Sequence, residues 1–348
     1  MMKKTDIEPA VWFPTIRCGT GTDVFTIRLV EGLQKRGIRA EICWLPHRAE
    51  YAPWTVPIPK PPAWANIVHI NSWTPPRFVP NHLMLVVTVH HGGHDPTLRP
   101  YKNLLRHVYH SYWIRPIEAA NIARAHAVTA VSRFVVGQIQ TLFGRPNIEV
   151  IYNGIDTKNH FTPGPARHTP HSPFRLLYVG NWMARKGVDL LGPTMELLGG
   201  DFELHYTADR AGAHTRYRLP ANTRCLGRLN TSALVRAYRE ADALLFPSRS
   251  EGLALAMIEA MGCGLPVIAS HIPPVTEIVT HELEGLLCPV DEVQEFCRAA
   301  RRLKQETELW GAMRLAARRK IEKRFALQTQ VHLYLELYRR LIASAALR

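Results

Sequence analysis

The sequence lacks the features that mark membrane-spanning proteins, disulfide-rich proteins and zinc-binding modules. No apolar run approaches the roughly 18 residues that a membrane-spanning helix needs. The six cysteines form no Cys-x-x-Cys pair, and no histidines cluster with them at zinc-site spacing. Residues 1–6 are basic but lack the apolar core of a signal peptide. A membrane-spanning protein, a disulfide scaffold and a zinc module are therefore not indicated, and we expect a reduced, cytoplasmic protein without metal or cofactor.

Acidic side chains are few relative to basic ones. The chain has 29 Asp and Glu against 43 Lys and Arg, which gives a formal net charge of +14. The excess is +8 in residues 1–160 and +6 in residues 161–348, so it is not confined to a basic tail. Nucleic acid, an anionic membrane face and phosphorylated substrates are all attracted by such a surface. Charge alone does not choose among them.

Short apolar runs rich in Val and Ile alternate with helical patterns along the 348 residues, and the alternation occurs twice. This pattern predicts two α/β domains, each with a parallel sheet. We expect an N-terminal domain over 1–160, a C-terminal domain over 161–330 and a terminal helix over 331–348. The default ligand site of this arrangement is a cleft between the domains, at the carboxyl ends of the strands. Strands are expected at 11–14, 38–45, 67–70, 83–89, 127–131, 174–179, 202–207, 243–246, 266–269 and 285–288.

The most informative segment is 246–269, where a buried strand is followed by a short polar loop and a helix that begins near Leu253. Glu251 lies in this loop, just before the helix, and Gly252 allows a ligand to approach the backbone closely. The free N–H groups of a helix start favour a phosphate or sugar hydroxyls. Acidic residues at a helix start also stabilise the helix itself, which accounts well for Glu251. It accounts poorly for Glu259, because a carboxylate among apolar neighbours is costly without partners.

This segment resembles the Glu-x7-Glu signature of the retaining glycosyltransferases of family 4. The surrounding Pro-Ser-x-x-Glu-Gly and Glu-Ala-Met-x-x-Gly-x-Pro-Val carry the resemblance, with Glu251 and Glu259 at the two acidic positions. It implies a GT-B fold of two Rossmann-like domains facing across a cleft, with the C-terminal helix over 331–348 crossing back to pack on the first domain. It also implies that Glu251 lies by the donor sugar and that Glu259 holds the ribose hydroxyls. The backbone between them, implied to bind sugar and diphosphate, comprises Gly252, Leu253, Ala254 and Leu255, with Leu253-Ala254 where the family commonly has Phe-Gly.

A cationic loop follows the first strand of the second half and ends at Gly187. It resembles the family's loop that neutralises the leaving diphosphate, and the implied cations are Arg185 and Lys186. Two cations at a strand end can do this without a metal. Where many members have an arginine directly after the glycine, this chain has Asn181, so we expect Arg185 to compensate. The alternative is a solvated basic pair in an exposed loop, and the position after a buried strand and before Gly187 favours the ligand role.

Two features of the first half resemble family landmarks. The turn around Gly21 is similar to the Gly-Gly-Thr-Glu loop that approaches the donor phosphates, with Thr20 in place of the first glycine. His90 matches a histidine beside the donor sugar and is expected to hold the sugar rather than act as a base. His91 is the second choice, a structural role is the alternative for either histidine, and Gly92 and Gly93 favour close approach of a ligand. The expected catalytic residues are thus His90, Arg185, Lys186 and Glu251.

Residues 99–124 combine basic and aromatic side chains in a helical pattern. Such a stretch docks on anionic membranes in some proteins and is a solvated helix face in others. Because family members often act on lipid-linked glycans, peripheral membrane contact is a hypothesis.

The resemblance implies a metal-independent, retaining transfer from a UDP-, GDP- or ADP-sugar to a glycan or lipid-linked acceptor, as in synthesis of cell-envelope polysaccharide or lipopolysaccharide. One alternative is a nucleotide-sugar epimerase of the same fold, which would need no acceptor. Another is a basic nucleic-acid-binding protein, but no binding motif of that class is present and the two glutamates would be unexplained. We therefore expect no nucleic-acid partner.

Overall fold

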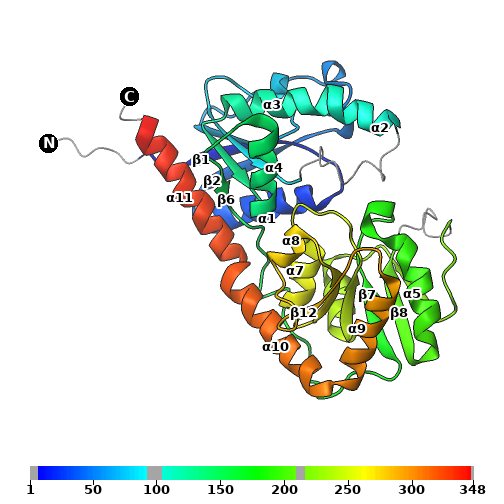
Figure 1. Ribbon diagram of the computed structural model, residues 1–348. Coiled ribbons are helices and arrows are strands. Elements are labelled where there is room, and N and C mark those ends of the chain that lie inside the picture. Colours follow the sequence, from blue (N-terminus) through cyan, green and yellow to red (C-terminus); the bar gives the residue numbers. More distant parts are fainter. Residues whose placement is uncertain (1–6, 92–103, 209–215, 346–348) are drawn as a thin grey trace. The chain divides into compact units, whose positions relative to one another are not determined.

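The computed structural model describes residues 7–91, 104–208 and 216–345. The chain divides into two compact units (Figure 1). Unit 1 comprises residues 1–154 together with 327–348, and unit 2 comprises residues 155–326. The boundaries expected from sequence were 160 and 330. The terminal helix begins four residues earlier than expected, so its first turn already belongs to unit 1.

Unit 1 is built on a six-stranded parallel sheet of order β2-β1-β3-β4-β5-β6. Its inner strands β3, β4 and β5 are almost wholly buried, as expected of a parallel sheet covered on both faces. The strands are β1 (Ala10–Ile16), β2 (Arg39–Leu45), β3 (Ile67–Asn71), β4 (Met84–Val89), β5 (Ala127–Ala130) and β6 (Glu149–Val150).

The helices of unit 1 follow the expected pattern with one refinement. The stretch 104–124 is a continuous helical run made of three pieces, and its middle piece is a π-helix. Residues 92–103, which include Gly92, Gly93 and the start of the basic stretch, lie outside the described residues. The helices are α1 (Gly21–Gln34), α2 (Leu104–Tyr109), the π-helix η5 (His110–Ile114), α3 (Arg115–Arg124), α4 (Arg133–Phe143) and α11 (Leu327–Ala345).

Helix α11 is part of the core of unit 1, although it is the last element of the chain (Figure 1). It packs against α1, where Gly32 faces Val331 so closely that an added Cβ would lie 2.3 Å from its Cγ2. The terminal helix is therefore an integral layer of unit 1.

Buried hydroxyls and one imidazole also tie α11 to the sheet. The Nδ1 of His69 lies 2.6 Å from the Tyr338 hydroxyl, and its Nε2 lies 2.7 Å from Thr88 Oγ1. The Tyr334 hydroxyl lies 2.9 Å from Thr88 Oγ1 and 3.1 Å from Thr129 Oγ1. Burial lowers the pKa of His69 to about 3, so the imidazole is neutral. Each of the side chains His69, Thr88, Thr129, Tyr334 and Tyr338 thus has a hydrogen-bond partner, as burial requires.

Unit 2 repeats the architecture with a six-stranded parallel sheet of order β12-β11-β10-β7-β8-β9. The two sheets confirm the predicted α/β fold of two Rossmann-like domains. The edge strand β9 was not predicted, because its sequence is polar and half-exposed. The strands are β7 (Phe174–Tyr178), β8 (Phe202–Thr207), β9 (Thr223–Gly227), β10 (Ala243–Phe246), β11 (Val267–Ser270) and β12 (Gly285–Cys288).

The helices of unit 2 cover this sheet (Figure 1). Helix α7 begins at Leu255, two residues later than predicted, because Ala254 has a non-helical ψ of 84°. No described helix of the chain is long and apolar enough to cross a membrane. The helices of at least eight residues are α5 (Leu191–Leu198), α6 (Thr231–Glu240), α7 (Leu255–Gly262), α9 (Val293–Gln305) and α10 (Thr307–Arg324).

Candidate functional site

The cationic loop and the Glu251 loop of unit 2 lie next to each other because they leave neighbouring strands. Strands β7 and β10 pair in parallel, so the loops that follow them both begin at the carboxyl edge of the sheet. The backbone N–H of Arg249 donates to the carbonyl of Arg185 over 2.9 Å, which joins the two loops directly. Side chains 65 positions apart in sequence are thereby brought together at the edge where ligands of open α/β sheets bind.

Lys186 and Glu251 form an ion pair at the centre of this arrangement. Lys186 Nζ lies 2.5 Å from Glu251 Oε1, and their side chains are 17% and 7% exposed. The Ser248 hydroxyl donates to the same oxygen over 2.7 Å. Arg185 Nη1 donates to the carbonyl of Ser250 over 3.2 Å, so a second cation stands beside the pair. Three of the residues singled out from sequence are therefore in one cluster.

The charges of this cluster stabilise one another. Burial acts to raise the pKa of Glu251, but the Lys186 and Arg185 cations outweigh it and hold that pKa below its ordinary value. Burial lowers the pKa of Lys186, an effect that Glu251 opposes. Glu251 is thus a carboxylate rather than a proton donor. The group fits binding and charge stabilisation better than general acid catalysis.

Gly187 allows the two loops to pack this tightly. Its φ of +70° lies in the left-handed region, and an added Cβ would lie 2.0 Å from the Pro247 carbonyl oxygen. The glycine that marked the end of the cationic loop in the sequence is therefore required by both conformation and contact.

Arg249 is a structural member of the site that sequence reasoning missed. Its guanidinium donates twice to the Asp189 carboxylate, over 2.7 Å each, and once to Asp291 over 2.5 Å. It also donates to the carbonyl of Ala184. These bonds clamp the cationic loop to the Glu251 loop. No sequence signal indicates them, because the partners lie 42 to 65 positions away.

The backbone between the two glutamates forms a buried turn and a helix start. Gly252, Leu253 and Ala254 are buried, and Leu255 opens α7. Among the described residues no side chain caps the N-terminus of this helix. An uncapped helix start beside Arg185 and Lys186 is suited to an anion.

Glu259 lies within α7 and is only 8% exposed. Its Oε2 accepts a hydrogen bond of 3.3 Å from the hydroxyl of Tyr238, which lies on α6. This carboxylate therefore has a polar partner, which comes from a different helix and which the sequence did not indicate.

In unit 1, His90 and the Gly21 turn lie at the carboxyl edge of the sheet. His90 follows β4, and its Nε2 lies 2.9 Å from Asn71 Oδ1 at the end of β3. The ring of Phe25, on the helix that Gly21 begins, stands edge-on to His90 at 4.5 Å. Burial lowers the pKa of His90 to about 3, so the imidazole is neutral.

The Gly21 turn is held by a carboxylate. Asp23 accepts hydrogen bonds from the backbone N–H groups of Cys18, over 3.1 Å, and Gly19, over 2.7 Å. Gly21 itself is exposed and is the first residue of α1. The turn thus presents backbone to solvent on a rigid support.

Two family models match the chain in sequence. Residues 62–159 match Glycosyltransferase Family 4, and residues 173–306 match Glycosyl transferases group 1. The chain belongs to glycosyltransferase family 4. The family-4 resemblance carried by the two glutamates is confirmed by these matches.

Curated relatives are similar to this family-4 chain over part of their length. The glycogen synthase of Mycobacterium tuberculosis is 28% identical over 242 residues, which are 63% of this chain and 57% of the relative. The N-acetyl-alpha-D-glucosaminyl L-malate synthase of Bacillus anthracis is 26% identical over 73% of this chain and 67% of that protein. The regions that align with this chain make up between 26% and 67% of the length of its curated relatives.

Solved structures share the fold along nearly the whole chain. The sucrose-phosphate synthase of Thermosynechococcus elongatus has a TM-score of 0.78 at 17% identity, covering 97% of this chain and 100% of that chain. Anabaena Alr3699/HepE, solved in complex with UDP and glucose, has a TM-score of 0.70 at 17% identity, covering 95% and 99%. The family-4 chain therefore has the GT-B fold.

Proposed function

We propose that this protein is a retaining glycosyltransferase that moves a sugar from a nucleotide-sugar donor to a glycan or lipid-linked acceptor. The observation that carries the proposal is the cluster of Arg185, Lys186 and Glu251 at the carboxyl edge of the unit 2 sheet. Family membership supplies the reaction class, and HepE, with the same fold, was solved with UDP and glucose.

In the proposed reaction, Arg185 and Lys186 neutralise the diphosphate as the bond between the sugar and the phosphate breaks. Fixed cations aimed at the developing charge stabilise a transition state without reorganisation. The acceptor hydroxyl attacks from the face that the phosphate leaves, and its proton passes to the leaving group. No metal is assigned to this step, because the two cations supply the charge that the diphosphate requires.

Glu251 is proposed to serve both the cation and the sugar. Its Oε1 accepts from Lys186 and from Ser248, so the carboxylate is held in one orientation. We assign Oε2 to a hydroxyl of the donor sugar. The turn from Gly252 to Leu255 is assigned to the sugar and diphosphate, and Glu259 to the ribose.

In unit 1 we assign Gly21 to the donor phosphates and His90 to the donor sugar. With Nε2 bonded to Asn71, the neutral imidazole turns its other nitrogen to a ligand. A base with a pKa near 3 is a weak proton acceptor at neutral pH, so His90 binds rather than abstracts.

A thermal-shift series with UDP-, GDP- and ADP-sugars tests the donor site. A cognate donor raises the melting temperature, because it binds only the folded state. Lys186→Met is expected to abolish this shift. The matched control is Lys320→Met, which removes an ion pair to the buried Glu284 in the same unit, away from both loops. If no nucleotide sugar shifts the wild-type curve, the donor-site assignment is wrong.

Product analysis separates this proposal from its alternatives. Transfer requires an acceptor and gives a glycoside whose anomeric configuration, measured by NMR, matches that of the donor. An epimerase would convert the donor to an isomer without any acceptor. Inversion of configuration would contradict retention, and dependence on added Mg²⁺ after treatment with EDTA would contradict metal independence.

A lipid-linked acceptor and peripheral membrane contact are supported by an exposed apolar stripe. Leu105, Val108 and Tyr112 are 80%, 45% and 79% exposed, at i, i+3 and i+7 of the helical run through α2 and η5. One face of a helix is thus apolar and open to solvent, in a chain of net charge +14. This combination suits the interface of an anionic membrane, such as the one on which cell-envelope glycans are built.

Co-sedimentation with vesicles tests the contact. We expect the protein to pellet with phosphatidylglycerol vesicles at low salt and not with phosphatidylcholine alone. Leu105→Ser with Tyr112→Ser should abolish pelleting, whereas Leu315→Ser, at a comparably exposed position on α10, should not. Equal pelleting of both variants would contradict this surface.

A further inference from the structure

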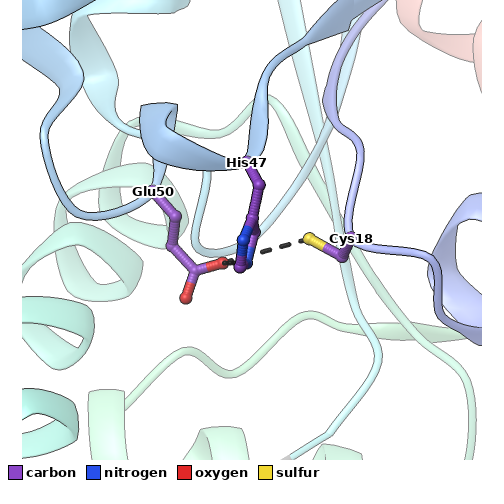
Figure 2. A group of neighbouring side chains, drawn as sticks. All are labelled: Cys18, His47 and Glu50. Carbon is purple, nitrogen blue, oxygen red and sulfur yellow. Dashed lines mark hydrogen bonds and ion pairs between the residues drawn. The ribbon is translucent and has the colours of Figure 1, made fainter. Parts of the chain in front are cut away.

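Three side chains outside the proposed donor site converge beside the Gly21 turn. Figure 2 shows Cys18, His47 and Glu50 turned toward one another. Cys18 Sγ lies 3.9 Å from Glu50 Oε2, and His47 Nε2 lies 3.8 Å from the same oxygen. All three potential ligand atoms lie within 4.8 Å of one another. Thiolate, imidazole and carboxylate are the ligand types of protein-bound zinc.

The fold of unit 1 creates this convergence. Strands β1 and β2 are parallel neighbours, and Cys18 follows one while His47 and Glu50 follow the other. The ligands are therefore 29 and 32 positions apart in sequence and adjacent at the sheet edge. No short sequence motif marks such a set, so a metal site here could not be predicted from the sequence.

The separations fit a tetrahedral ion after small side-chain rotations. Zinc bonds of about 2.0–2.3 Å place neighbouring ligand atoms about 3.3–3.7 Å apart. The two separations from Glu50 Oε2 exceed that by a few tenths of an ångström. His47 has a 63% exposed side chain, so it can turn toward the thiol without disturbing the core.

Neighbouring groups already orient the Glu50 ligand. The hydroxyl of Tyr109 donates to Glu50 Oε1 over 3.0 Å, which leaves Oε2 directed at Cys18 and His47. The indole N–H of Trp113 donates to the Glu50 carbonyl over 2.8 Å. Outer partners of this kind set the direction of metal-binding carboxylates.

We propose that Cys18, His47 and Glu50 bind one Zn²⁺ ion, with the fourth position open to water. Binding forms a Zn–S bond as the thiol proton passes to the buffer. The ion would tie the start of the Gly21 turn to the loop after β2, and it would be separate from the metal-independent transfer step.

The ligand types select among divalent cations. A thiolate and an imidazole are soft or borderline ligands, whereas Mg²⁺ and Ca²⁺ take oxygen ligands.

The test is metal binding by the full-length protein, which needs no donor or acceptor. Zn²⁺ affinity is measured by competition with a chromophoric chelator, and Co²⁺ is added to look for the absorption band of a cobalt–thiolate bond. We expect one Zn²⁺ per chain and a Co²⁺ thiolate band. Cys18→Ser should weaken Zn²⁺ binding by more than about 100-fold, since even loss of an outer partner costs about 10–100-fold.

Matched variants distinguish this site from adventitious binding at a thiol. Cys225→Ser removes an exposed cysteine and should leave Zn²⁺ affinity and the Co²⁺ band unchanged. Tyr109→Phe, which keeps all three ligands, should weaken binding about tenfold. Circular dichroism of the metal-free proteins checks that each variant is folded. Absence of stoichiometric binding, or loss of binding in Cys225→Ser but not in Cys18→Ser, overturns the proposal whatever the outcome of the donor assays.

Discussion

Lys186 and Glu251 are each largely removed from water, and each therefore depends on the other. A buried ion pair adds little net stability, because desolvation offsets the attraction, but loss of one partner leaves an uncompensated charge that costs about 3–5 kcal/mol. Stability alone therefore does not explain an ion pair at the ends of two buried strands, whereas binding of a charged ligand does. The physical character of the pair thus agrees with the proposed diphosphate site.

Replacement of Lys186 should affect catalysis more than any comparable surface change. We expect Lys186→Met to lower kcat/KM by about 10²–10³-fold, the usual effect of removing one group that stabilises transition-state charge. Steady-state kinetics with the cognate donor measures this. Lys320→Met should lose stability without a comparable loss of kcat/KM, because Lys320 pairs with Glu284 outside the loops. Equal kinetic losses in both variants would point to a purely structural role for Lys186.

His90 should make stability depend on pH in a defined window. Its pKa is about 3 when folded and about 6.5 when unfolded, so between these values only the unfolded state is protonated. Its stabilising contribution is complete above pH 6.5 and falls by about 1.4 kcal/mol per pH unit as the pH decreases toward 3. His90→Gln should remove this slope from the free energy of unfolding, measured by denaturant titration from pH 7 to pH 5.

Asn71→Ala is the control for this effect. It removes the hydrogen-bond partner of His90 but keeps the imidazole buried, so the pH slope should persist. Parallel curves for wild type and His90→Gln would show that the imidazole is not held neutral by burial.

At the scale of elements, the close contact of α1 with α11 explains how the terminal helix is docked. The missing side chain of Gly32 is replaced by the Val331 methyl group. Gly32→Ala should therefore destabilise unit 1 by about 1–3 kcal/mol through overpacking, even though alanine favours a helix. Denaturant unfolding measures the loss.

A second substitution on α11 tests whether the contact is the cause. Val331→Ala should cost stability by itself but restore part of it in the Gly32→Ala background, because neighbouring substitutions couple. Strict additivity in this cycle would mean that Gly32 is needed for some other reason than the space it gives to Val331.

At the scale of the molecule, the chain passes through unit 2 before it completes unit 1. Residues 327–348 belong to the first unit in space, and their apolar face fills the core between α1 and the sheet. Removal of these residues should expose that core and break the hydrogen bond of His69 with Tyr338. We expect hydrogen exchange of the shortened chain to show lost protection in β1, β3 and α1, with β7 and β10 still protected.

The full-length protein is the reference for that experiment. Uniform loss of protection over both units would show that they do not fold as separate cores. Unchanged protection in α1 would show that the terminal helix is dispensable for unit 1.

The sequence by itself determined the two α/β units, the family and the elements that carry the candidate residues. The spacing of apolar residues indicates which faces of helices and strands are buried. Local motifs such as Pro-Ser-x-x-Glu-Gly indicate turns from a strand into a helix. Both signals lie within short stretches of the chain. The loops that carry Arg185, Lys186 and Glu251 were predictable for this reason, and so was the presence of a terminal helix.

The tertiary structure alone decided which distant side chains meet. Lys186 with Glu251, Tyr238 with Glu259, the clamp made by Arg249 and the convergence of Cys18 with Glu50 link positions 21 to 65 residues apart. Parallel strands bring such loops to one edge, and the order of strands in the sheet is not written in any local pattern. Local interactions thus determine which helices and strands form. The order of the strands and the packing of the domain determine which side chains meet at the strand ends.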